Sequence, residues 1–241
     1  MVIKKLIYRS VSCENYLRIL QRSYFILYKT GVLKFDSKFD CHYFVRNLIK
    51  KGDVIIDIGA NLGYYSILFA KWAGTTGKIY SVEPITVYNK IFNEKAKKYR
   101  QITLYPYALG EEEKEVELVN HGYLRTGLPR VYDAKKDGAI DHYEFRVKAQ
   151  MKKASELFEN LDRIDYIKCD IEGYEFNVLS DIKGLLSKFK PIVQVEGNDI
   201  KIFDLFNELG YNTYRIRDRQ LVLVEDKSLD GDYIFIHHSM S

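Results

Sequence analysis

The chain has 241 residues, of which 46% are apolar and 14% aromatic, and its formal charge is +4. This length fits one α/β domain with an appendage, and the apolar share is large enough for a sizeable core, which excludes a disordered chain. The three cysteines lack CxxC spacing, which excludes a disulfide framework and a cysteine zinc site.

The positive charge is concentrated in the first thirty residues, which are also rich in Leu, Ile, Tyr and Phe. The charged residues of this segment are Lys4, Lys5, Arg9, Arg18, Arg22 and Lys29, against Glu14 alone. Such a segment favours either a weak peripheral contact with an anionic membrane or a helix that packs on the domain and exposes its lysines. Arg9 and Glu14 interrupt any apolar leader, and no apolar run approaches the roughly 20 residues of a membrane span. We therefore expect a cytoplasmic protein.

Short apolar runs alternate with helical patterns through most of the chain. The spacing predicts a helix over residues 14–29, stopped by Gly31, and a second helix over about 40–50. Strands are expected at 54–59, 78–84, 102–110, 165–173 and 191–197, with helices at 64–72, 86–98, from 174 to about 188, and near 200–209. This alternation indicates βαβ units and a doubly wound, parallel α/β sheet of Rossmann-like type.

Two stretches depart from the alternation. Residues 115–120 and 143–149 look like antiparallel strands that flank a polar loop, and three more strands are expected at 211–217, 220–225 and 233–238. We therefore expect a helical N-terminal extension over residues 1–51 and one domain over 52–241, with an insert at about 113–149.

The stretch from Asp57 to Gly63, DIGANLG, joins a buried-looking strand to a helix. Its glycines allow a ligand to approach the backbone closely and allow positive φ. Asn61 stands where a third glycine would fit, and asparagine tolerates the left-handed region. The helix start offers unpaired N–H groups for a carboxylate or phosphate. Taken alone, this pattern fits a strand-to-helix turn capped by Asp57 equally well.

Glu83 adds a second feature, twenty residues beyond Gly63 at the end of the next strand. A carboxylate in this position can accept hydrogen bonds from ribose hydroxyls, as in dinucleotide-binding folds. The dinucleotide fingerprint would need glycines at the positions of Asn61 and Tyr64. The combination favours a ligand with an amino-acid head and an adenosine tail, with Asp57 near its ammonium group.

Three stretches resemble, in the right order, the FkbM family of methyltransferases. They are GDVIIDIGANLGYYSILFAKWAGTTGKIYSVEP (52–84), YALGEEE (107–113) and DYIKCDIEGYEFNVL (165–179), so the resemblance covers about residues 52–197. It implies a class I methyltransferase fold with a mostly parallel, seven-stranded sheet. It also implies S-adenosylmethionine as the cofactor and methyl donor, and usually O-methylation of sugar or natural-product hydroxyls.

The resemblance also implies the cofactor-binding residues. Glu83 would bind the ribose, and Ala108 and Leu109 would lie near the adenine. The other implied contacts come from the glycine turn and from strand ends: Asp57, Gly59, Ala60, Asn61, Gly63, Pro84 and Asp170.

Methyl transfer to an alcohol needs a base, because a hydroxyl is a poor nucleophile until its proton is removed. Asp170 and Glu172 end the strand expected beside the glycine-turn strand, and repulsion between close carboxylates raises one pKa. Asp170 is the first candidate for the base and Glu172 the second. An Asp-x-Glu pattern before a helix is also typical of capping, and Glu175 fits that role better than catalysis.

Glu196, at the end of the following strand, is a candidate for binding the acceptor. Together with Asp170, Glu172 and Asn198 it could hold a divalent cation through oxygen ligands. Carboxylates converge at strand ends in many metal-free sites, and we expect no metal.

The insert supplies three further candidates and could fold over the acceptor as a lid. Histidine is the side chain whose charge ordinarily changes near neutral pH, so His121 is an alternative base. Arg125 and Arg130 could hold a phosphate or carboxylate of the acceptor. Exposed loop residues of these types are also common without any function.

The leading hypothesis is an S-adenosylmethionine-dependent O-methyltransferase that acts on a hydroxyl of a sugar, glycan or glycolipid precursor. The same donor with an RNA or protein acceptor is an alternative, although no stacking aromatic motif or basic stripe in the core indicates nucleic acid. A nicotinamide-dependent oxidoreductase and a non-catalytic protein that retains the pocket are further alternatives.

Overall fold

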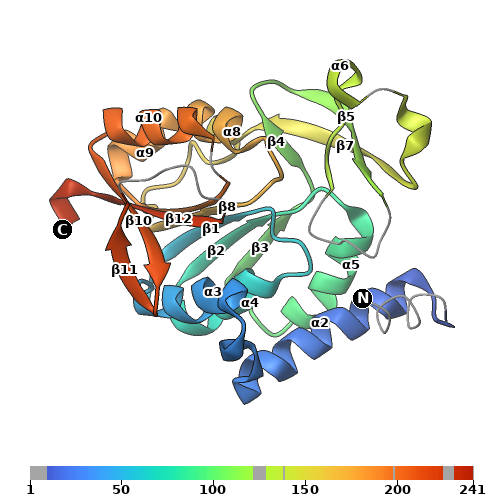
Figure 1. The fold of residues 1–241 in the computed structure, drawn as a ribbon, viewed down its shortest axis with the longest axis horizontal. Helices are drawn as coiled ribbons and strands as arrows, with labels where there is room; N and C mark the ends of the chain where they lie inside the picture. The colour runs from blue at the N-terminus through green and yellow to red at the C-terminus, as the bar shows by residue number, and fades with distance from the viewer. Residues whose placement is uncertain (1–9, 122–128, 138, 198, 225–230, 241) are drawn as a thin grey trace.

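The computed structural model describes residues 10–121, 129–137, 139–197, 199–224 and 231–240. A mixed sheet runs through the centre of the molecule, with the strand order β11-β10-β12-β9-β8-β1-β2-β3 (Figure 1). Its strands are β1 (Val54–Ile58), β2 (Lys78–Val82), β3 (Ile102–Tyr105), β8 (Tyr166–Cys169), β9 (Ile192–Glu196), β10 (Tyr211–Arg217), β11 (Gln220–Leu223) and β12 (Asp232–His237). After β1 the chain adds β2 and β3 on one side of that strand, and it later returns to add β8 and β9 on the opposite side. The strand order therefore switches direction at β1. Sheets of this kind bind ligands at the carboxyl ends of the strands beside such a switch.

The pairing is parallel from β9 through to β3 and antiparallel at the other edge. The expectation of seven strands was wrong, because the sheet of the described residues has eight. The additional edge strand, β11, follows β10 through a two-residue turn at Asp218 and Arg219. Both turn residues have positive φ, which is the backbone geometry that a tight hairpin requires.

Helices cover both faces of the sheet. Neighbouring residues of β1 point to opposite faces, and because residues on both faces are apolar, both faces need to be buried. Ile55 belongs to the same core cluster as Phe69 of α4 (Tyr64–Ala73), whereas Ile56 belongs to the cluster of Val178 on α8 (Glu175–Asp181) and Phe203 on α10 (Ile200–Glu208). Figure 1 shows α8, α9 and α10 above the sheet and α3 and α4 below it. The main helices are α4 (Tyr64–Ala73), α5 (Thr86–Ala96), α8 (Glu175–Asp181), α9 (Lys183–Phe189) and α10 (Ile200–Glu208). Among the helices of the described ranges, none combines the length and apolar character of a membrane span.

The N-terminal part of the chain forms the long helix α2 (Cys13–Thr30) and several short turns. Ser12 accepts a hydrogen bond from the Asn15 N–H at its start, and Gly31 ends it with φ of 79°. The helix expected over 40–50 is shorter: α3 (Asp40–Phe44) is followed by a 3₁₀ turn at Val45–Asn47, in which the Leu48 N–H bonds Val45 O, three residues back. α2 packs outside α4 and α5, and its buried side chains are Tyr16, Leu17, Gln21, Tyr24 and Phe25.

A second sheet lies beside the carboxyl ends of the central strands, in the order β4-β7-β5-β6. Its strands are β4 (Ala108–Gly110), β5 (Lys114–Asn120), β6 (Arg130–Val131) and β7 (Phe145–Lys153). The strand expected over 102–110 divides into β3 and β4 around Pro106, which has no N–H group to continue a ladder. β5 and β7 pair antiparallel, as predicted from their alternation.

Candidate functional site

The loop after β1 folds back on the end of β2. The N–H groups of Gly59 and Ala60 both donate to Val82 O, at 3.0 and 2.9 Å. Gly59, Asn61 and Gly63 have φ values of 79°, 51° and 80°. The prediction that Asn61 adopts a left-handed conformation in place of a glycine is therefore confirmed, and its side-chain oxygen accepts the Leu62 N–H at 2.8 Å.

Gly59 and Gly63 are required for different reasons. A Cβ atom on Gly59 would lie 1.8 Å from the Asp170 carbonyl oxygen, so the absence of a side chain lets the ends of β1 and β8 meet. A Cβ atom on Gly63 would lie 2.4 Å from the Phe92 ring. Gly63 therefore serves the packing of α4 on α5, and it lines none of the cavities described below.

Glu83, just after β2, is only 4% exposed and organises this loop. One carboxylate oxygen accepts the Asn61 N–H at 2.8 Å, and the other accepts the Ile85 N–H at 2.9 Å. Burial raises the pKa of Glu83 to about 7, although these two hydrogen bonds act in the opposite direction. Each carboxylate oxygen keeps a further lone pair for a ligand hydroxyl.

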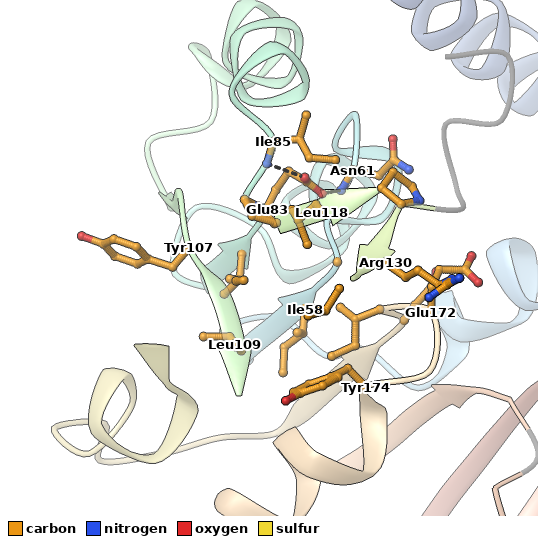
Figure 2. A pocket seen from close by; sticks show the side chains of 18 residues that line it. Ile58, Asn61, Glu83, Ile85, Tyr107, Leu109, Leu118, Arg130, Glu172 and Tyr174 are labelled. Carbon is orange, nitrogen blue, oxygen red and sulfur yellow. Dashed lines mark hydrogen bonds between the residues drawn. The ribbon is translucent and has the colours of Figure 1, made fainter. Parts of the chain in front are cut away.

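Glu83 lines a cavity of about 680 Å³, which we call cavity A. Figure 2 shows the Glu83 carboxylate with its hydrogen bond to Ile85, together with the apolar side chains of Ile58 and Leu109. The residues predicted from the sequence that line cavity A are Gly59, Asn61, Glu83, Pro84, Ala108, Leu109, Arg130, Asp170 and Glu172. Its mixture of apolar walls and one buried carboxylate suits a nucleoside.

A row of buried polar side chains crosses the sheet directly below the loop. Ser81, Asp57, Lys168 and Gln194 are in register on four adjacent parallel strands and are between 0% and 3% exposed. One oxygen of Asp57 accepts the Ser66 hydroxyl at 2.5 Å. The other oxygen, Oδ1, is buried without a hydrogen-bond partner within the described part of the chain. Burial raises the pKa of Asp57, against the effect of Lys168. An unpaired buried carboxylate oxygen is the feature expected where a ligand supplies the missing donor.

Lys168 is the functional side chain that the sequence did not reveal. Its ammonium nitrogen lies 2.7 Å from Oδ2 of Asp170 and 5.0 Å from the centre of the Tyr65 ring. Burial lowers the pKa of Lys168, but the carboxylates of Asp170 and Asp57 outweigh burial and raise it above its usual value. A fixed positive charge therefore sits between the two acids that the sequence placed at the site.

A second cavity of about 810 Å³, cavity B, lies on the other side of the glycine loop. Its lining includes Lys38, His42, Asp57, Gly59, Ala60, Asn61, Tyr64, Tyr65, Lys168, Asp170, Glu196 and Asp232. The N-terminal segment contributes His42, whose ring stacks on Tyr65 at 4.3 Å and whose Nδ1 is 2.7 Å from the Tyr24 hydroxyl. Burial lowers the pKa of His42 to about 3, so its ring is neutral at physiological pH.

The turn between β8 and α8 forms part of a third, acidic cavity of about 700 Å³, cavity C. Glu172 has a φ of 55° there, and burial followed by repulsion from Asp170 raises the pKa of Glu172 to about 7. Glu175 accepts the N–H groups of Ile171 and Gly173 at 2.9 Å, which agrees with a structural role for this acid. The lining also includes Glu196, whose pKa is raised by Asp170 and by burial.

Asp170 lines all three cavities and therefore marks their junction. Glu196 lines cavities B and C. Among the described residues, no group of three His, Cys, Asp or Glu side chains has the geometry of a metal site. Asn198, the fourth ligand considered from the sequence, lies outside the described residues.

The candidates from the insert are less directly placed. Arg130 lines cavity A, but its guanidinium forms two hydrogen bonds to Asp137, at 2.7 and 2.5 Å, and one to the Tyr143 hydroxyl at 3.0 Å. His121 is exposed, and its ring lies 4.8 Å from Tyr143. It lines none of cavities A, B and C as far as the described residues go. Arg125 lies outside the described residues.

A family model described as the methyltransferase FkbM domain matches residues 57–217, more than half of the chain. No curated protein gives a significant match.

Among solved structures, the chain is similar to methyltransferase FkbM from Methylobacillus flagellatus, with a TM-score of 0.54, 17% identity, and coverage of 82% of this chain and 47% of that one. This similarity concerns the fold, and the chain spans about half the length of that relative. Two weaker similarities have a TM-score of 0.44. One is to an S-adenosylmethionine-dependent O-methyltransferase from Thermotoga maritima, with 14% identity and coverage of 83% and 64%. The other is to fibrillarin from Aeropyrum pernix with bound S-adenosylmethionine, with 13% identity and coverage of 78% and 68%.

Proposed function

Because the chain belongs to the FkbM family of methyltransferase domains, we propose that it transfers the methyl group of S-adenosylmethionine to a hydroxyl of a sugar, glycan or glycolipid precursor. The observation that supports this most directly is Glu83. It is a buried carboxylate at the end of β2, beside a glycine loop and facing a cavity with largely apolar walls.

The residues of cavities A and B fit the two ends of the donor. Glu83 would accept hydrogen bonds from the two ribose hydroxyls, and Ala108 and Leu109, which also line cavity A, would provide an apolar surface for adenine. On the other side of the loop, the unpaired Oδ1 of Asp57 is a suitable acceptor for the ammonium group of the methionine part. S-Adenosylmethionine supplies an electrophilic methyl group to a nucleophile held nearby.

Glu172 is the residue that best fits the base for the acceptor hydroxyl. It lines cavities A and C, and a pKa of about 7 allows it to be ionised and yet to accept a proton at neutral pH. Asp170, the first candidate from the sequence, is already paired with Lys168 at 2.7 Å. Its carboxylate is better suited to holding the acceptor in position than to removing a proton.

The acidic lining of cavity C supports a neutral acceptor rather than a nucleic acid. Its carboxylates are Asp170, Glu172, Glu175, Glu196 and Asp199. Carboxylates accept hydrogen bonds from sugar hydroxyls and repel phosphate groups. The three free cysteines suit a reducing compartment, so we place the reaction in the cytoplasm.

Calorimetry with the purified chain tests the donor. S-Adenosylhomocysteine should bind and NAD should not, and binding of NAD alone would overturn the proposal in favour of an oxidoreductase. The acceptor class is tested by transfer of a labelled methyl group to a panel of glycosides, with structured RNA and a protein mixture as competitors. Labelling of RNA or protein without labelling of any glycoside would contradict a sugar acceptor.

A further inference from the structure

The exposed side of α2 and the turn that follows it carry apolar side chains. Ile19 and Ile26 are 37% and 62% exposed, Val32 is 50% exposed, and Phe35 is 93% exposed. Ile19 and Ile26 are seven residues apart and lie on one side of the helix, opposite the side that packs on α4 and α5. Single exposed apolar residues are common, but a group of them on one surface is typical of an interaction site.

Five basic side chains accompany these apolar residues. They are Arg22 and Lys29 on α2, Lys71 on α4, Lys95 on α5, and Lys98 in the turn after α5. Arg22 and Lys29 share the side of α2 that carries Ile26, whereas Lys71 and Lys95 lie beside Phe25 at the packed edge of the helix. We call these five cations, together with Ile19, Ile26, Val32 and Phe35, the α2 face. Figure 1 shows α2 along the lower edge of the molecule, outside α4 and α5.

The cations of the α2 face lie close enough together to affect one another. The ammonium groups of Lys71 and Lys95 lie 5.5 and 4.5 Å from the centre of the same ring, that of Phe25 on α2. Burial and then repulsion from Lys98 lower the pKa of both lysines. The clustered charge therefore costs the folded protein free energy, which an anionic partner would offset.

Within the described residues, none of these five cations forms a salt bridge. The nearby acids, Glu14 at the start of α2 and Glu94 on α5, form their salt bridges with Arg18 and Lys90, although Glu94 is also close enough to Arg22 to feel its charge. The charge of the α2 face is therefore available to a partner outside the chain.

We propose that the α2 face docks on an anionic lipid surface. Basic side chains attract acidic head groups, while exposed Ile, Val and Phe side chains enter the boundary between head groups and acyl chains. RNA would satisfy the basic side chains but would leave the aliphatic ones without a partner, because its recognition relies on aromatic stacking and polar contacts. The docking does not depend on the proposed methyl transfer.

Sedimentation of the full chain with vesicles tests the docking. The chain should sediment with phosphatidylcholine vesicles that contain phosphatidylserine, and not with phosphatidylcholine alone. Added salt should weaken the association, because the Debye length shrinks. Absence of the chain from the anionic vesicle pellet at low salt would overturn the proposal.

Two variants of the α2 face and one control separate docking from general effects. The double variant Lys29→Glu with Lys98→Glu should weaken vesicle binding by more than tenfold, since each basic residue contributes about fivefold. Phe35→Ser should weaken it at all salt concentrations. The control, Lys188→Glu with Leu223→Ser, changes an exposed lysine on α9 and an exposed leucine on β11, and should bind as the unchanged chain does.

Each variant is compared by thermal unfolding, so that loss of fold is not mistaken for loss of docking. Equal loss of binding in the control would contradict a role for the α2 face. If the unchanged chain does not bind vesicles but binds RNA or itself, and the α2-face variants lose that binding, the proposal is overturned. The surface is then assigned to nucleic acid or to a second copy of the chain.

Discussion

The ammonium group of Lys168 lies 2.7 Å from a carboxylate oxygen of Asp170, in a part of the sheet where Lys168 itself is only 3% exposed. Lys168 is also in register with Asp57 on the neighbouring strand. One buried cation therefore compensates two carboxylates that both face the proposed cofactor site, and it links the stability of the sheet to the electrostatics of that site.

Replacement of this cation should be costly. Lys168→Met leaves Asp57 and Asp170 without compensation, and breaking a buried pair in this way typically costs about 3–5 kcal/mol. Urea unfolding should show the loss at pH 7 and a smaller loss at pH 5, because burial raises the pKa of Asp57 and this carboxylate then binds a proton more readily. Lys78→Met, at the exposed start of β2, is the matched control and should change little. A Lys168→Met variant as stable as the control would show that the carboxylates do not depend on this ammonium.

Removal of the Glu83 carboxylate should weaken cofactor binding. Glu83→Ala removes an acceptor for the ribose hydroxyls and two hydrogen bonds that shape the loop. We expect the binding free energy of S-adenosylhomocysteine to weaken by about 1–3 kcal/mol, so its dissociation constant should rise roughly five- to 150-fold. Calorimetry measures this, with Glu159→Ala on the surface as control. An unchanged constant would remove Glu83 from the site.

The raised pKa of Glu83 should make the free energy of unfolding depend on pH. Its pKa is about 7 in the folded chain against an ordinary value of 4.5, so between these pH values the folded state holds a proton that the unfolded state has released. The free energy of unfolding should therefore fall as pH rises through this window, by up to about 3 kcal/mol for this group. Glu83→Gln should flatten the dependence, as followed by urea unfolding from pH 4 to 8. An equally steep dependence in the variant would assign it to other groups.

The assignment of Glu172 as the base makes a kinetic prediction. Glu172→Gln should lower kcat by about 10²- to 10⁴-fold while cofactor binding is retained, since proton removal is a catalytic contribution of that size. In the unchanged enzyme, kcat/KM should rise with pH and level off above about 7, and this rise should be absent from the residual activity of the variant. If Asp170→Asn abolishes the rise and Glu172→Gln keeps it, the base is Asp170.

The local features of the glycine loop were predictable because they depend on neighbours in the sequence. A strand followed by DIGANLG requires positive φ at particular positions, and Asn61 satisfies this requirement. The position of Glu83 followed from parallel topology alone. The strand-to-helix turn held by Glu175 was likewise predictable from its place before a helix.

The site residues contributed by distant segments were not predictable in this way. Lys168 in a four-residue strand resembles an exposed lysine, and only its register between Asp57 and Gln194 shows that it is enclosed. His42 is remote in sequence from the loop, and its place in cavity B depends on how α3 packs against Tyr65. The strand at 220–225 was expected from the sequence, but its place at the edge of the central sheet depends on the two-residue hairpin to β10 rather than on apolar alternation.

The stacking of His42 on Tyr65 sets a practical limit on how far this chain can be shortened. The family match begins at residue 57, but a fragment trimmed to that boundary would lack His42 and Tyr24. Cavity B would then lose the part of its lining that Lys38 and His42 provide. A shortened chain that keeps the lining of cavity B must therefore include α2 and α3, although the family match begins at residue 57.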